Sequence, residues 1–226
     1  MVAIFKTGSS LKTTLNYNEN KVRKGVAECI HAENYPLEHH ELNFHHKLNM
    51  LLKYASLNKN VKANSVHISL NFDPSERLSN EQLKEIANAY MQQVGFGEQP
   101  YLVYRHEDAG HPHIHIVSVK VDRSGKRIDT QNIGKNQSEK ARKNIEQAFG
   151  LVSAEAGKKE EMNITVGRLQ YGKTETKRAI SNVLAHVLKQ YRFSSLPELN
   201  AVLKLYNVTA DRGSETSRMY QGRGLV

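Results

Sequence analysis

The sequence predicts an α+β fold, in which a central antiparallel sheet with flanking helices is followed by a small, mainly helical C-terminal region. Two observations support this class. Short β-type runs are separated by longer segments with helical periodicity. The runs at 99–106 and 112–121 are joined by a short, polar link that contains glycine, which is typical of a β-hairpin. Neighbouring strands joined in this way favour an antiparallel sheet with helices packed against it.

The order of the elements follows from hydrophobic periodicity. Runs with the composition or alternation of strands are 2–6, 65–72, 99–106 and 112–121. Apolar residues at helical spacing mark helices at about 21–32, 41–57, 79–94, 138–149 and 180–191, and a last one from Ser195. Two helix starts carry capping boxes, Ser79 with Gln82 and Ser195 with Glu198. A turn is expected at 122–126 and a short hairpin around 211–213.

Composition narrows the class of protein. The 226 residues include 32 Lys and Arg against 23 Asp and Glu, a net charge of +9, and this excess predicts a polyanionic partner such as nucleic acid. No run approaches the ~18 apolar residues of a membrane helix, and the first residues lack a secretory signal. Cys29 is the only cysteine, which excludes a disulfide framework and a cysteine-based zinc site. We therefore expect a cytoplasmic protein without membrane insertion.

The histidines of the expected hairpin point to a metal site. Residues two apart in a strand share a face, so His113 and His115 should project together. His106 ends the preceding strand, and the hairpin brings it roughly opposite His113. Three imidazoles on two rigid strands form a facial ligand set that leaves metal positions open for substrate. His111, on the link, could replace His106 as the third ligand or simply lie in solvent.

Two other features have simpler interpretations. The segment 39–46 contains His-Glu-x-x-x-His, which is one residue too long to set both imidazoles of a zinc-protease motif on one helical face. We interpret it as the solvated start of a helix. Tyr17 lies among polar residues after the first strand, and this pattern alone favours a half-buried tyrosine that anchors a loop.

The string His113-Ile114-His115 resembles the His-hydrophobic-His signature of the HUH endonucleases. The order of features is similar to that of conjugative relaxases of the mobilisation-protein type. The strings NYNENKV, HISLNF and YRHEDAGHPHIHIV are similar to relaxases of Bacteroides-type mobilisable elements. The resemblance covers about 2–129 well and continues more weakly over 171–226. With the Ala/Gly/Lys/Glu-rich segment 151–162 as the boundary, it implies a relaxase nuclease domain at 1–157 and a helical region at 158–226 that recognises DNA.

The resemblance also implies an activity and a set of catalytic residues. Such an enzyme nicks single-stranded DNA at the transfer origin of a plasmid or mobile element. Tyr17 would be the nucleophile, forming a 5′-phosphotyrosyl intermediate and freeing a 3′-hydroxyl. His106, His113 and His115 would hold a divalent metal ion, Mg²⁺ or Mn²⁺. The implied partners are origin DNA, accessory relaxosome proteins and a type IV coupling protein.

Further residues are expected near the metal or the DNA. Asp108 or Glu107 could orient a ligand histidine without binding the metal itself. Basic residues that could contact the DNA backbone are Lys120, Arg123, Lys126, Arg127 and Arg178. Two other functions stay open from the sequence: a replication initiator or transposase with the same metal site, and a non-catalytic DNA-binding protein stabilised by a metal.

Overall fold

The computed structural model describes residues 1–155 and 176–216, the latter with side chains from 179 onward. The chain divides into two compact units, Met1–Lys159 and Glu160–Val226. The first unit contains an antiparallel sheet with helices, so the predicted α+β class is confirmed. No helix in the described ranges is long and apolar enough to cross a membrane.

The sheet has five strands, and all its neighbouring pairs are antiparallel. In spatial order the strands are β1 (Val2–Gly8), β3 (Ser65–Asn71), β5 (His113–Val119), β4 (Tyr101–His106) and β2 (Ala27–Glu33). β5 is central and buried along its whole length. The strand with the His-hydrophobic-His signature is therefore held on both sides, by β3 and β4.

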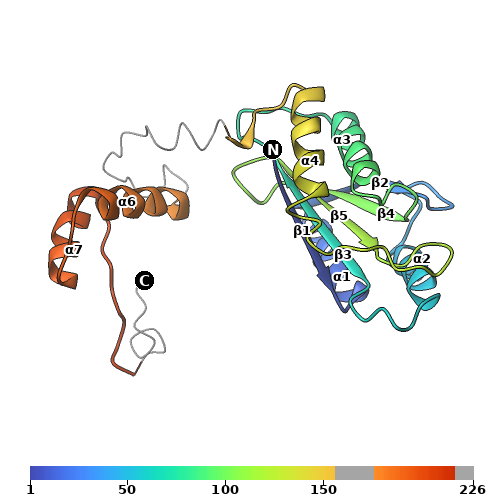
Figure 1. Cartoon of the computed structure of the whole chain (residues 1–226), viewed down its shortest axis with the longest axis horizontal. Helices are drawn as coiled ribbons and strands as arrows, with labels where there is room; N and C mark the ends of the chain where they lie inside the picture. Colours follow the sequence, from blue (N-terminus) through green and yellow to red (C-terminus); the bar gives the residue numbers. More distant parts are fainter. Residues whose placement is uncertain (156–175, 217–226) are drawn as a thin grey trace. The chain divides into compact units, whose positions relative to one another are not determined.

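Helices cover both faces of the sheet (Figure 1). α1 (Leu11–Arg23) and α2 (Phe44–Ser56) lie on one face, and α3 (Asn80–Gln93) and α4 (Gln137–Ala148) lie on the other. The alternation of β5 sorts its side chains between two cores. Ile114 and Ile116 pack in the core with α3 and α4, whereas Val117 and Val119 pack in the core with Leu15 of α1. His113 and His115 share the face of Val117, so they face the layer that contains α1.

The segment after β1 differs from the prediction. The helix expected at 21–32 is wrong, because α1 spans Leu11–Arg23 and ends before that segment. The side chain of Ser10 caps α1 by accepting from the backbone N–H of Thr13, 3.1 Å away. Tyr17 therefore lies on a helix and not in a loop. Residues 27–33 form the edge strand β2, whose register shifts between Cys29 and His31.

Other elements agree closely with their predicted positions. α3 begins with the predicted capping box of Ser79 and Gln82, and it is followed by Gly95 at φ +81°, a backbone conformation that favours glycine. α2 begins three residues later than predicted, since the Asn43 side chain accepts from the backbone N–H of His46. His40 and His45 are exposed, so the histidine-rich segment 39–46 is largely solvated as interpreted.

The second unit contains α6 (Thr176–Gln190), α7 (Leu196–Leu203) and the short 3₁₀ helix η1 (Lys204–Tyr206). They pack through a small core that includes Val183, Val187 and Leu203. The capping box predicted at the start of α7 is only half formed, because Glu198 accepts from Ser194. The described residues 207–216 contain no strand, so the hairpin predicted around 211–213 is wrong there; 217–226 lie outside the described residues.

Candidate active site

Three histidines from two adjacent strands converge near one end of the sheet. His106 of β4 pairs directly with His113 of β5, and His115 follows on the same face two residues later. Each residue offers one ligand atom, and these atoms lie within 4.8 Å of one another. The ring centroids of His106 and His115 are 4.2 Å apart. The structure thus brings together the three histidines named from the sequence.

The orientation of His106 is set by a residue of α1. Its Nε2 lies 3.0 Å from Oδ1 of Asn18, whose Nδ2 donates to the carbonyl oxygen of Thr14 at 3.0 Å. An amide oxygen only accepts, so Nε2 of His106 carries the proton. Nδ1 is then a bare lone pair, and this buried atom has no hydrogen-bond partner in the described part of the chain. A buried lone pair aimed into a histidine cluster fits a metal ligand.

The other two histidines are also held through the nitrogen that faces away from the cluster. Nδ1 of His113 lies 3.2 Å from the carbonyl oxygen of His111, so it donates and leaves Nε2 unprotonated. Nδ1 of His115 lies 2.9 Å from Nε2 of His67 on β3. The ring of His111 is held by Asn71, with 3.3 Å between Nε2 and Oδ1. In the described residues His111 therefore supports the cluster through its backbone, and its ring is outside the three-histidine set.

The cluster favours neutral imidazoles. Burial lowers the pKa of His106 to about 4, and the charges of Lys21 and His113 act in the same direction. Burial, followed by the neighbouring His106 and His67, lowers the pKa of His115 to about 2. The pKa of His113 is lowered as well, chiefly by burial. Since the neutral imidazole is the form that binds metals, the donor set suits a cation.

Tyr17 lies beside this cluster. Leu15 and Asn18 face the sheet and are fully buried, and this places Tyr17 at the border of the buried face of α1. Its ring centroid is 6.2 Å from that of His106, 5.9 Å from that of His115 and 5.7 Å from that of His67. The residue keeps 44% of its surface exposed, so a substrate can reach it.

A charged pair connects α1 to the hairpin link. Lys21 is one turn after Tyr17, and its Nζ lies 4.7 Å from the centroid of the Tyr17 ring. The same ammonium forms an ion pair with Asp108. Partial burial lowers the pKa of Lys21, but Asp108 and Tyr17 more than offset this effect, so the net shift is upward. Glu107 points elsewhere, toward Arg105 at 3.4 Å, and its side chain is largely exposed.

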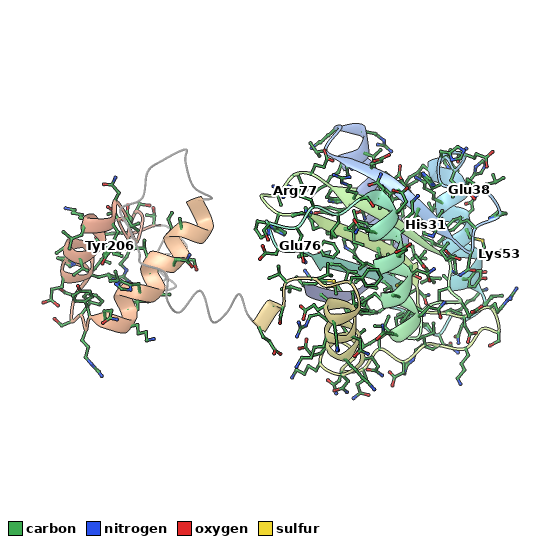
Figure 2. The ribbon with its side chains drawn as sticks, turned by 90° about the horizontal axis from the view of Figure 1, so that it is seen from above. His31, Glu38, Lys53, Glu76, Arg77 and Tyr206 are labelled. Atoms are coloured by element: carbon green, nitrogen blue, oxygen red, sulfur yellow. The ribbon has the colours of Figure 1, made fainter. Side chains whose placement is uncertain are left out.

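A pocket of about 550 Å³ adjoins the histidines. His106 and His113 form part of its wall. The charged residues of the lining are two arginines and two glutamates, Arg77, Arg105, Glu76 and Glu107. Figure 2 shows Arg77 on one side of the first unit and Lys53 of α2 on the opposite side. The pocket gives a polar approach to the end of the sheet where the cluster lies, and the charges of its two arginines are balanced by those of two glutamates.

Four of the basic residues predicted to contact DNA lie away from the cluster. Lys120, Arg123, Lys126 and Arg127 follow the opposite end of β5 from His113, about 20 Å away along the strand. Lys120 is buried, whereas the three others are exposed. The side chain of Arg178 lies outside the described residues.

Asn18 and Lys21 were not anticipated as parts of the site, and His67 was interpreted as part of an exposed polar strand face that could touch substrate, not as a partner of His115. Recognising α1 in the sequence would have revealed two of them, because Lys21 is one turn from Tyr17 and Asn18 is a polar residue on the buried face. His67 lies on the polar face of an alternating strand, which gave only a weak signal.

An antiparallel sheet with a histidine cluster and an adjacent tyrosine is the arrangement that the sequence led us to expect of a relaxase. Residues 17–151 match the family model for the MobA/VirD2-like relaxase nuclease domain. The chain therefore belongs to the MobA/VirD2-like relaxase family, and the matched region is a nuclease domain that acts on DNA. Comparison with curated proteins finds no match.

Proposed function

We propose that this protein nicks single-stranded DNA at a transfer origin and initiates the conjugative mobilisation of a plasmid or mobile element. The observation that carries the proposal is the position of Tyr17, an exposed phenol whose ring lies 5.9 Å from His115 and 6.2 Å from His106. The similarity to Bacteroides-type relaxases supports the same function. We expect the protein to act in the cytoplasm with accessory relaxosome proteins and a type IV coupling protein.

In the proposed reaction the hydroxyl oxygen of Tyr17 attacks the phosphorus of one phosphodiester. A new O–P bond forms and the bond to the 3′-oxygen breaks, which leaves a 5′-phosphotyrosyl link and a 3′-hydroxyl. The phenolic proton passes to water, which reaches the exposed Tyr17 side chain, and the departing 3′-oxygen takes up a proton from water. The covalent link conserves the energy of the phosphodiester, so the strand can be rejoined without another energy source.

The residues around Tyr17 support its role as a nucleophile. A neutral phenol is a weak nucleophile, and its attack on a phosphate develops negative charge on the reacting oxygens. The ammonium of Lys21, 4.7 Å from the ring centroid, supplies a positive charge on the same helix that would offset this charge. Asp108 holds this ammonium in place through their ion pair.

His106, His113 and His115 are the residues that would hold Mg²⁺ or Mn²⁺. A divalent ion at this site would polarise the scissile phosphate and offset its developing negative charge. Asn18 and His67 fix the orientation of two of these imidazoles through their outer nitrogens. Such outer partners are usual in metal sites and maintain the ligand tautomer.

The decisive experiment incubates the protein with a labelled single-stranded oligonucleotide that contains the origin sequence, together with Mg²⁺ or Mn²⁺. A denaturing gel should show a protein–DNA adduct, and chelation of the metal should abolish it. An oligonucleotide with a scrambled sequence is the control. Binding without any adduct would contradict the proposal and favour a non-catalytic DNA-binding protein.

A further inference from the structure

Asp108 is one more potential ligand, and it lies on the inner side of the histidine cluster. Asp108 lies in the link between β4 and β5, and its Oδ1 is 3.7 Å from Nδ1 of His106 and 3.5 Å from Nε2 of His113. These are the two nitrogens left unprotonated by the hydrogen bonds to Asn18 and to the carbonyl of His111. Asp108 therefore faces the inner nitrogens of two of the three histidines, His106 and His113.

In this arrangement three hydrogen-bond acceptors face one another: Oδ1 of Asp108, Nδ1 of His106 and Nε2 of His113. A carboxylate oxygen has no proton to donate, and neither do the inner nitrogens of neutral His106 and His113. Three converging acceptors repel one another unless a cation lies between them. The lack of a partner for Nδ1 of His106 in the described ranges agrees with this reading.

The separations also fit a shared ion. Metal bonds of about 2.0–2.2 Å to nitrogen and oxygen put neighbouring ligand atoms about 2.8–3.1 Å apart in octahedral sets and about 3.3–3.6 Å apart in tetrahedral sets. The two distances from Asp108, 3.5 Å and 3.7 Å, are close to the tetrahedral separation and within about 1 Å of the octahedral one. We propose that Oδ1 of Asp108 is a fourth protein ligand of the ion held by His106, His113 and His115. This inference rests on the metal site of the proposed function.

A carboxylate ligand has two consequences, one for the choice of metal ion and one for the charge of the site. Imidazoles alone suit Zn²⁺, Cu²⁺, Fe²⁺ or Ni²⁺, whereas oxygen ligands suit Mg²⁺ and Mn²⁺, so Asp108 moves the site toward the latter ions. The other carboxylate oxygen, Oδ2, binds the ammonium of Lys21. That ammonium balances the charge of Asp108, so the ion would keep its attraction for a DNA phosphate.

A competing explanation is that Asp108 serves only to hold Lys21 beside Tyr17. The two explanations differ in metal affinity. If Asp108 is a ligand, Asp108→Asn weakens metal binding, while Lys21→Met leaves it unchanged or makes it tighter, since a positive charge next to the ion is lost. If Asp108 only positions Lys21, Asp108→Asn changes the affinity through charge alone. It then leaves the ligand set, and with it the visible spectrum of bound Co²⁺, as in the wild-type protein.

The test is calorimetric titration of the metal-free full chain with Mn²⁺ alone, without DNA. Asp108→Asn should weaken Mn²⁺ binding at least tenfold, and Asp108→Glu should recover part of the loss. Glu107→Gln, which removes the neighbouring exposed carboxylate, is the matched control and should bind like wild type. Unchanged affinity in Asp108→Asn, or an equal loss in Asp108→Asn and Lys21→Met, would overturn the proposal.

Titration with Co²⁺ gives a second reading that does not depend on affinity. The visible spectrum of bound Co²⁺ reports the ligand set, so Asp108→Asn should change it and Glu107→Gln should not. An identical spectrum in Asp108→Asn and wild type would count against Asp108 as a ligand. Failure of the wild-type protein to bind either ion would instead refute the metal site of the proposed function.

Discussion

Nε2 of His106 donates a hydrogen bond to Oδ1 of Asn18 at 3.0 Å, and this bond joins a candidate metal ligand on β4 to the helix that carries Tyr17. Both residues are buried, at 2% and 0% exposure, so water cannot easily replace the bond. Since Asn18 follows Tyr17 directly, the same contact sets the position of the proposed nucleophile relative to the cluster.

Replacing Asn18 should therefore weaken the metal site. Asn18→Ala leaves the N–H of His106 buried without an acceptor, which costs about 1–3 kcal/mol of stability. The loss of an outer hydrogen bond should also weaken Mn²⁺ binding about 10–100-fold. Chemical denaturation and calorimetry measure the two effects. Asn20→Ala, on the exposed side of the same helix, is the control. Equal stability and equal Mn²⁺ affinity in the two variants would refute the role of Asn18 in holding His106.

Tyr17→Phe should abolish the covalent adduct but leave oligonucleotide affinity within a few-fold. The substitution removes one oxygen from an exposed side chain, so the fold and the basic surface should persist. A denaturing gel reports the adduct and fluorescence anisotropy reports the affinity. Tyr35→Phe is the matched control, because Tyr35 follows the far end of β2 and donates to the carbonyl of Lys47. A normal adduct in Tyr17→Phe would place the nucleophile elsewhere.

The elements that could be predicted from the sequence are those with a strong local pattern. Strand β3 alternates along its length, and α3 begins with a capping box, so both were predicted within two residues of their bounds. α1 was missed because few of its residues are apolar: Leu11 and Leu15 anchor it to the sheet, and the rest of its buried face includes Asn18. β2 lies at an edge, and its register shift interrupts the alternation on which strand prediction depends.

In the candidate site, too, only the features with a local sequence pattern could be predicted. The spacing of His113 and His115, two residues apart in a strand, was enough to predict a shared face. The contacts of Asn18 with His106 and of Lys21 with Asp108 join residues 88 and 87 positions apart, so no local spacing reveals them. Their prediction would require both the α1 helix and its packing against the sheet.

Removing one of the three proposed ligand histidines should be more damaging than removing His111, their neighbour on the link. His106→Ala, His113→Ala and His115→Ala should each severely reduce Mn²⁺ binding and cleavage. His111→Ala should be mild, because the carbonyl that accepts from His113 belongs to the backbone and remains. Calorimetry with Mn²⁺ decides the matter. A strong loss at His111 with none at His106 would reverse the choice of the third ligand.

The stability of the metal-free protein should fall in mild acid. The pKa values of His106 and His115 are about 4 and about 2 in the folded protein, below the ordinary value of about 6.5. Below pH 6.5 the unfolded chain binds more protons than the folded one, so stability is complete above that pH and is lost as the pH falls toward 4. Thermal unfolding in the presence of a chelator, from pH 7 to pH 4, measures this slope. His115→Gln should flatten it, and an unchanged slope would contradict the prediction.

The last prediction concerns the second unit, which we propose contributes DNA recognition and no chemistry. Its described part includes exposed Lys189 and Arg192 beside a small apolar core of its own. The double variant Lys189→Gln/Arg192→Gln should bind origin DNA more weakly, and each lost phosphate contact should lower the slope of log affinity against log salt by about 0.7 on single-stranded DNA.

A chain that ends at Gly157 should keep adduct formation through Tyr17 but show a larger loss of affinity and slope. Replacing exposed Lys59 and Lys62 of the first unit by glutamine removes the same charge and is the control for net charge alone. If truncation leaves affinity and slope unchanged, the second unit serves another purpose, such as binding a protein partner.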